Sequence, residues 1–186
     1  MMLKRLLIII SLFFTSDLYA ASFDIALSDE SAQFKTQMPV GGTTLGRSEI
    51  ALGFLYHDEE RYVLDTALLV IDVAGSKTPG LELGVGPKAY YIDSNLGTAF
   101  SIALGGQMRY KMRNLPRYFV SAKVFYAPGI VSFGDAKDVY EFGIYANYEL
   151  LPTADIYLGY HHIHADFDQG SQSVDESLMF GMKVGF

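Results

Sequence analysis

The chain has 186 residues, half of them hydrophobic, with 14 Lys and Arg against 21 Asp and Glu, no Cys and a formal net charge of −7. The length fits a single domain, and the acidic balance argues against nucleic acid as a partner. Without cysteine the chain has no disulfide framework and no thiol-linked lipid.

The first 20 residues are typical of a secretory signal peptide. Lys4 and Arg5 precede an apolar run at 6–14, and Ala20 offers a small residue for cleavage. The run is shorter than the roughly 20 residues that a spanning helix needs. We therefore expect a signal peptide at 1–20 and a mature domain at 21–186, with a retained N-terminal anchor as the alternative.

The segment 23–38, FDIALSDESAQFKTQM, precedes the first long strand pattern. It fits a short hairpin with Asp29 and Glu30 at its tip, which would add two strands. The alternatives are a segment inside a barrel lumen and a tail in the periplasm.

From residue 48 onward, segments of alternating character predict about eight long strands. They lie at 48–57, 62–73, 81–91, 100–112, 118–126, 140–150, 156–162 and 177–186. Each has a large apolar face. The segment 62–73 is ambiguous, because it is apolar on both faces apart from Asp65 and Asp72.

The second face of these strands mixes glycines with charged residues, which suits the narrow bore of a small barrel. The charged residues are Glu49, Glu82, Lys88, Arg109, Lys111, Lys123, Glu141, Glu149 and Lys183. We predict an all-β, antiparallel, up-and-down transmembrane β-barrel of about eight strands, or ten with the N-terminal hairpin, in the cell outer membrane. A soluble periplasmic barrel with an apolar interior is the alternative.

The connections alternate in kind. Three are compact (75–80, 113–116 and 151–155), whereas the others, at 57–60, 92–98, 127–138 and 165–176, vary and include longer loops. Outer-membrane barrels have short periplasmic turns and longer external loops, so we expect the second set outside. These loops would be acidic, with Asp58, Glu59, Glu60, Asp166, Asp168, Asp175 and Glu176.

Aromatic residues are spaced as two interfacial girdles would be. Those expected near the periplasm are Tyr110, Tyr118, Tyr148 and Phe186, and those expected near the outer surface are Tyr56, Tyr91, Phe100, Tyr126, Tyr140 and Tyr160. The last strand carries alternating apolar residues that fit an assembly signal read by strand pairing: Leu178, Phe180, Met182, Val184 and Phe186.

The segments FSIALGGQMRYKM at 100–112, FYAP at 125–128 and YANYELLPTADIYLGYHH at 145–162, with the closing strand to Phe186, resemble the YfaZ-like outer-membrane proteins of Gram-negative bacteria. The resemblance covers most of the mature chain. It implies an outer-membrane barrel of unestablished role and supplies no catalytic residues.

Chemical sites are weakly indicated. His162 and His164 share a strand face at a spacing that would suit a transition metal, although a strand end at the lipid headgroups explains them as well. His162 with Ser171, Ser173 or Ser177 would be a base and a nucleophile, without any local signature. The glycine-rich GVGPK at 84–88 lies inside a strand and is no phosphate loop. We expect no catalytic residue, no cofactor and no enzyme.

Three function classes remain: a structural or binding barrel with acidic external loops, a narrow pore, and a lipid-modifying enzyme. We favour the first, because small barrels have bores filled by side chains. The expected partners are outer-membrane lipid, lipopolysaccharide and the assembly machinery. We expect a monomer that is not a general diffusion porin.

Overall fold

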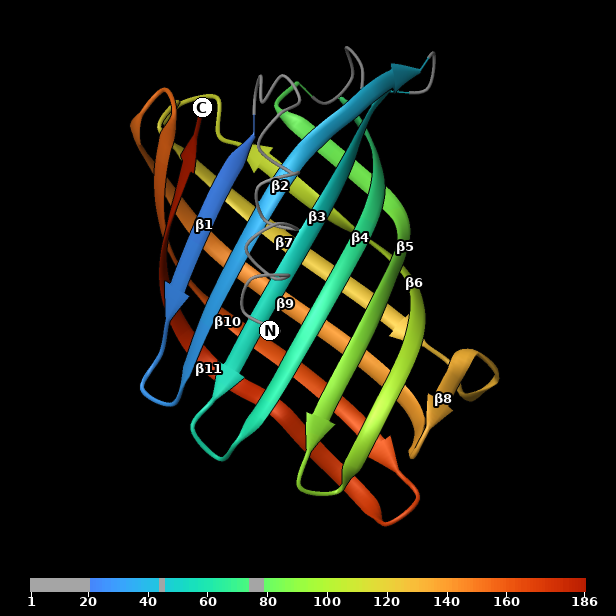
Figure 1. The fold of residues 1–186 in the computed structure, drawn as a ribbon. Coiled ribbons are helices and arrows are strands. Elements are labelled where there is room, and N and C mark those ends of the chain that lie inside the picture. The colour runs from blue at the N-terminus through green and yellow to red at the C-terminus, as the bar shows by residue number, and fades with distance from the viewer. Residues whose placement is uncertain (1–20, 44–45, 74–78) are drawn as a thin grey trace, which may run out of the picture.

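The structure is a computed structural model that describes residues 21–43, 46–73 and 79–186. The signal peptide expected at 1–20 lies outside these residues. The described chain is almost entirely β (Figure 1). Its elements are β1 (Ser22–Leu27), β2 (Ser31–Thr43), β3 (Gly46–His57), β4 (Arg61–Val73), β5 (Leu81–Ser94), β6 (Gly97–Lys111), β7 (Tyr118–Ala127), the 3₁₀ turn η1 (Gly129–Val131), β8 (Ser132–Gly134), β9 (Ala136–Leu151), β10 (Ala154–Phe167) and β11 (Gly170–Gly185).

Every strand other than β8 pairs in antiparallel fashion with its neighbours along the chain. β7 pairs with β9, and β1 pairs with β11, so the sheet closes on itself. The short β8 pairs with the end of β6, beyond the point where β7 stops. The fold is therefore a closed barrel of ten strands with one extra strand, and the N-terminal hairpin belongs to its wall.

The described residues contain no helix that is long and apolar enough to cross a membrane. Instead, large apolar side chains cover the outside of the barrel, as on Leu104 (70% exposed), Leu178 (68%) and Val85 (64%). In water such a surface would be unstable, whereas lipid accommodates it. The outward faces agree with the expected alternation.

The ambiguous segment 62–73 becomes β4 with Asp65 turned inward and Asp72 outward. Its two faces are apolar for different reasons. Leu64 and Leu68 are exposed on the outer surface, which faces lipid, whereas Val63 and Leu69 are buried inside the barrel. The periodicity of the sequence alone could not distinguish the two environments.

The expectation of long outer loops is largely wrong. β5 and β6 extend to a two-residue turn at 95–96, and β10 and β11 extend to one at 168–169, so most of 92–98 and 165–176 is strand. Only 127–136 keeps a larger connection, which contains η1 and β8. The turn residues in these segments mark tight hairpins. The polar residues on either side of each turn still belong to the paired strands.

The barrel has two distinct mouths. Ser22 pairs with Gly185, so the described chain begins and ends at one mouth, called here the terminal mouth. The hairpin turns at 28–30, 58–60, 95–96 and 168–169 form the opposite, far mouth. Expected girdle aromatics meet across strands at both ends: Tyr118 faces Tyr148 near the terminal mouth, and Tyr126 faces Tyr140 near the far mouth.

Replacing Leu104 by Arg tests the outward face of the barrel. Leu104 lies midway along β6, and arginine at the bilayer midplane costs about 2–4 kcal/mol. We expect a loss of this size in the free energy of unfolding, measured by urea titration in lipid vesicles. Leu151→Arg, at the terminal rim, should cost about 0–1 kcal/mol. Equal losses at both positions would contradict a lipid-facing wall.

Candidate functional site

The bore contains three successive layers of side chains. A polar vestibule opens at the terminal mouth, a belt of buried charges crosses the middle, and an apolar plug fills the space toward the far mouth. The charged belt consists of Asp65, Lys88, Lys123, Glu141, His161 and Asp175, together with the hydroxyl of Tyr90. These residues come from six different strands, so the belt ties opposite walls of the barrel together.

Glu141 is the centre of the belt. Its side chain has no exposed surface, and its two oxygens lie close to two ammonium groups, a hydroxyl and an imidazole. Oε1 lies 2.5 Å from Lys123 Nζ and 3.0 Å from His161 Nε2. Oε2 accepts from Lys88 Nζ at 2.6 Å and from the Tyr90 hydroxyl. A buried carboxylate is tolerated when its lone pairs are satisfied in this way.

Lys88 connects this centre to a second acid. Its ammonium lies 3.1 Å from Asp65 Oδ1, and both side chains are 5% exposed. The same ammonium lies 4.8 Å from the centre of the Tyr90 ring and 5.3 Å from that of Phe125. These ring faces attract a cation and replace part of its lost hydration.

His161 is held between two carboxylates. Its Nδ1 lies 2.9 Å from Asp175 Oδ2 and its Nε2 lies 3.0 Å from Glu141 Oε1, and all three side chains are fully buried. A neutral imidazole has only one N–H, so it cannot donate to both acids. A neutral His161 therefore donates to one acid only, and its tautomer decides which of the two.

Glycines in the wall make room for this belt. A Cβ at Gly53 would overlap the carboxylate of Asp65, and one at Gly143 would lie 2.9 Å from Lys123 Cε. The sequence predicted that small and charged residues would share the inner face. They do so because the absent side chain of each glycine leaves space for a charged side chain of a neighbouring strand. A narrow barrel can hold long polar side chains only where the facing strand carries none.

The vestibule is a cavity of about 170 Å³. Its lining mixes both signs of charge, including Asp24, Lys35, Arg47, Glu49, Arg109 and Lys183. Arg47 lies 2.9 Å from Glu49 and 3.3 Å from Glu82, and Arg109 stacks 3.8 Å above the Phe119 ring. The lining reaches inward as far as Lys123 and Tyr145, where the belt begins.

The apolar plug was missed by sequence reasoning, which expected an inner face of small and charged residues throughout. It consists of Leu55, Val63, Ile92, Phe125, Val139, Ile163 and Phe167, none of them more than 3% exposed. The signal was present in 62–73, where both faces are apolar. Such residues pack against one another and exclude water from this part of the bore.

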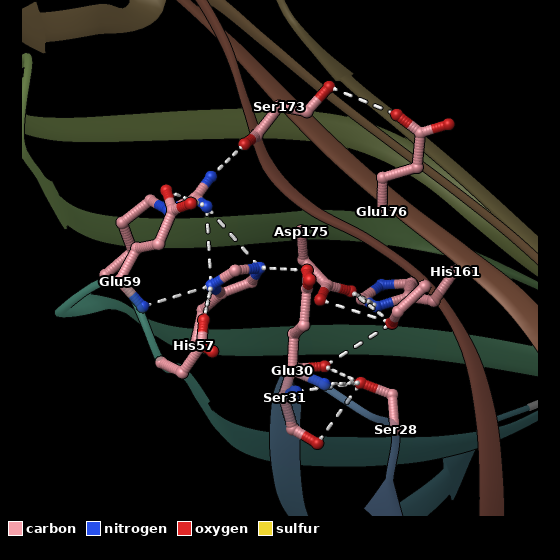
Figure 2. A network of polar contacts seen from close by, with 12 residues as sticks. Ser28, Glu30, Ser31, His57, Glu59, His161, Ser173, Asp175 and Glu176 are labelled. Carbon is pink, nitrogen blue, oxygen red and sulfur yellow. Dashed lines mark hydrogen bonds and ion pairs between the residues drawn. The ribbon is translucent and has the colours of Figure 1, made fainter.

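A polar network lies over the plug at the far mouth (Figure 2). Arg61 donates to the backbone carbonyl of Ser173 and lies 2.6 Å from Glu59 Oε2, and its guanidinium also contacts His57. Ser28 and Ser31 hydroxyls lie 2.8 Å apart. The network joins the tips of the first two hairpins to β11.

This far-mouth network continues into the charged belt. The Ser31 hydroxyl lies 3.4 Å from that of Ser177, which donates to Asp175 at 3.3 Å, and Asp175 contacts His161. Asp175 was expected in an acidic external loop. That expectation is wrong, because β11 extends through it and turns its carboxylate into the bore.

The weak metal candidates lie on the outer wall near the far mouth. His162 and His164 do share a face, with ring centres 6.0 Å apart; His164 stacks on Tyr140, and the His162 ring lies tilted against it. His162 Nε2 lies 3.2 Å from the Tyr140 hydroxyl, and His164 Nε2 lies 3.4 Å from Asp166 Oδ1. Within the described ranges, no group of three or more His, Cys, Asp or Glu side chains is arranged to hold a metal ion.

Among the described residues, no hydrogen bond joins His162 to any of the serines proposed as its partners, Ser171, Ser173 and Ser177. Ser177 points into the bore and bonds to Asp175, whereas His162 lies on the outside, 3.7 Å from Glu176. Ser173 donates to Glu176 at 3.4 Å. No base and nucleophile pair forms on these residues as the structure describes them.

The proposed assembly strand is the end of β11. Leu178, Phe180 and Met182 point outward and are 68%, 58% and 45% exposed, and Phe186 is 76% exposed. Val184 is half-buried and lies opposite Phe23 of β1. The structure places the apolar side of this strand toward lipid; recognition by assembly machinery stays a prediction.

A family model described as YfaZ precursor matches residues 4–186. The chain belongs to the YfaZ family. This membership confirms the resemblance seen in the sequence. Together with a closed barrel whose outer face is apolar, it identifies an outer-membrane β-barrel protein. Among curated proteins no sequence relative is detected.

Solved structures similar to this YfaZ chain include an outer membrane channel and a porin. The outer membrane channel DcaP of Acinetobacter baumannii is 15% identical, with a TM-score of 0.46 over 88% of this chain, which spans only 54% of that channel. The KdgM porin is 8% identical, with a TM-score of 0.43 over 90% of this chain and 99% of the porin. These likenesses are too distant to transfer a function.

Replacing Glu141 by Gln tests the role of the belt. The change removes the carboxylate beside Lys123 and leaves Lys88 with Asp65 alone, and breaking a buried ion pair on one side typically costs about 3–5 kcal/mol. We expect a loss of this size in the free energy of unfolding of the YfaZ barrel, measured by urea titration with heat-modifiable gel migration as the readout.

Glu149→Gln is the matched control for this measurement. Glu149 pairs with Lys111 at 2.7 Å, but the two side chains are 24% and 42% exposed. Partly exposed ion pairs contribute at most about 1 kcal/mol. If both variants lost the same stability, Glu141 would not be the centre that holds the bore together.

Proposed function

We propose that this YfaZ protein is a structural or binding barrel of the outer membrane and not a general diffusion porin. The observation that carries the proposal is the complete burial of Glu141 among two ammonium groups, a hydroxyl and an imidazole in the middle of the bore. An open aqueous pore would hydrate such a carboxylate. Here protein donors replace water on both of its oxygens.

Barrel size supports the same proposal. Barrels of eight to ten strands have bores that side chains fill, whereas open diffusion pores use about 16 strands. In this barrel the filling has two parts, the charged belt and the apolar plug, and an ion would have to displace both. A narrow pore is the second candidate, favoured by the vestibule of about 170 Å³ at the terminal mouth.

The orientation follows from strand parity. With an even number of wall strands, both ends of the described chain lie at one mouth, and outer-membrane barrels place that mouth in the periplasm. The far mouth would then face the cell exterior. Its exposed acids, including Glu30, Asp58 and Glu59, would contact divalent cations or the headgroup region of lipopolysaccharide.

We further propose that the protein is a monomer without enzymatic activity, inserted by the assembly machinery through its last strand. Support for the absence of enzymatic activity is the separation of His162, on the outer face, from Ser177, which points into the bore. Support for insertion through the last strand is the outward apolar row from Leu178 to Met182.

Single-channel recording in planar bilayers tests the proposal against a pore. We expect the wild-type protein to give no steady large openings, because the belt and the plug occlude the bore. A large porin reconstituted in the same bilayer serves as the positive control. Steady openings of porin size would contradict the proposal, and small selective ones would favour the narrow pore.

Incubation with lipopolysaccharide, followed by mass spectrometry of the lipid, tests the enzymatic alternative. We expect the acyl chains to stay unchanged after incubation with the folded protein. A heat-unfolded sample is the control for spontaneous hydrolysis. Released or transferred acyl chains that depend on the folded barrel would show that the protein is an enzyme.

A further inference from the structure

The vestibule at the terminal mouth contains a cation without a counter-charge. Lys35, from the middle of β2, lines this cavity and is half-buried there. In the described chain its ammonium contacts no carboxylate, carbonyl or hydroxyl group. The other lysines of the lining differ in this respect, because Lys123 lies 2.5 Å from Glu141 and Lys183 donates to Gln37. Lys35 is therefore available to a ligand in the cavity.

The charged groups that act on Lys35 do not balance it. Two of them are ammonium groups, those of Lys88 and Lys123. The other two are the carboxylates of Glu141 and Asp65, which already contact these ammonium groups. Three ammonium groups thus share two carboxylates, and one positive charge is left over where the vestibule meets the belt. Charges inside a protein are normally paired, so an anion from outside the chain would complete this site.

Other donors on the cavity wall are also unused. Arg109 stacks on the Phe119 ring and lies 3.9 Å from Asp155, but in the described chain it donates no hydrogen bond. The half-buried amide of Gln107 lines the same cavity and has no partner among the described residues. Cationic and amide N–H groups of this kind hold a carboxylate by charge-assisted hydrogen bonds.

The rest of the lining restricts the charge and the size of such an anion. Four carboxylates also line the cavity, those of Asp24, Glu49, Glu82 and Asp155. They would repel a ligand with several negative charges. Ile71 and Phe119 add apolar surface. The volume of about 170 Å³ is close to that of an engineered cavity of about 150 Å³ that holds benzene. A single carboxylate on a short hydrocarbon body fits these conditions.

We propose that the vestibule binds a small organic monocarboxylate, whose carboxylate pairs with the Lys35 ammonium. Its hydrocarbon part lies against the apolar side chains of the lining. The ligand enters from the terminal mouth, where the lining includes Arg47 with a side chain that is 47% exposed. It neutralises Lys35 without displacing the charged belt. This inference rests on the binding role proposed above and names its class of ligand.

The test uses the folded mature protein in micelles of an uncharged detergent. Mildly acidic pH keeps lysine protonated and a carboxylate ionised. The probe is butanoate, and butanamide is its control of equal size without charge. Sulfate provides a compact dianion. Binding is followed through the NMR signal of the Gln107 side-chain amide, which lines the cavity, and the affinity is obtained from its saturation.

We expect saturable binding of butanoate and affinities at least about tenfold weaker for butanamide and for sulfate, because the first lacks the charge and the second meets the four carboxylates. Lys35→Met should weaken butanoate binding by at least about tenfold, whereas Lys35→Arg should retain most of it. The barrel should fold in both variants, since neither adds a buried charge and Lys35→Met removes repulsion from Lys88 and Lys123.

Lys111→Met is the matched control, because it removes the same charge from a lysine that does not line the vestibule. Lys111 pairs with Glu149 at 2.7 Å, and we expect its replacement to leave the butanoate affinity unchanged. Heat-modifiable gel migration shows that each variant is folded. If Lys35→Met failed to fold, the comparison of butanoate with butanamide would decide.

The inference would be overturned if butanoate did not bind, or if butanamide bound equally well, since the charge of Lys35 would then play no part. Unchanged butanoate binding in folded Lys35→Met, or tighter binding of sulfate, would also overturn it. None of these results affects the conductance test. A closed barrel that binds no carboxylate keeps the proposed structural role, whereas large openings would contradict that role and leave the Lys35 site standing.

Discussion

The interior of this barrel depends on how a buried carboxylate is neutralised. Glu141 projects from β9 into a bore that is too narrow for bulk water, so its charge must be balanced by protein groups. Lys88, Lys123, Tyr90 and His161 provide that balance from strands β5, β7 and β10. Since these groups come from three strands around the barrel, satisfying one acid fixes the distance between opposite walls.

The same interaction gives the bore its layered order. His161 contacts both Glu141 and Asp175. Asp175 accepts from Ser177, whose hydroxyl lies near that of Ser31 beside the hairpin tips at the far mouth. The apolar plug packs beside this polar chain, where no carboxylate requires a partner. Polar groups are thus confined to a connected path and the remaining volume is filled by side chains without hydrogen-bonding needs.

The unequal lengths of β1 and β11 have a separate consequence. A sheet closed with strongly tilted strands brings its first and last strands together over only part of their length. Here the six residues of β1 pair with only part of the sixteen-residue β11, and the remaining edge is covered by side chains such as Arg61. The wall of the barrel is therefore weakest in backbone pairing at the far mouth, which is also where acidic side chains gather.

Particular residues show how far the sequence leads. The alternation of Ile50, Leu52, Phe54 and Tyr56 correctly identified an outward face, and Gly53 correctly marked the inner one. Tight hairpins replaced expected loops because Asp166 and Asp175, typical of turns, continue as strand residues. The direction of Asp65 and the inward position of Asp175 could not be read from the sequence, since each depends on a partner, Lys88 or His161, far along the chain.

The sequence by itself determined the class of this protein: a YfaZ-family, outer-membrane, antiparallel barrel with an apolar outside and a polar, glycine-containing inside. A period of two residues is a local property, and a lipid-facing wall imposes it on every strand. Only the tertiary structure decided which charges meet in the bore, that its far half is apolar, and where β11 lacks a partner. These features depend on strand register and stagger around a closed sheet, which are set by all ten wall strands together.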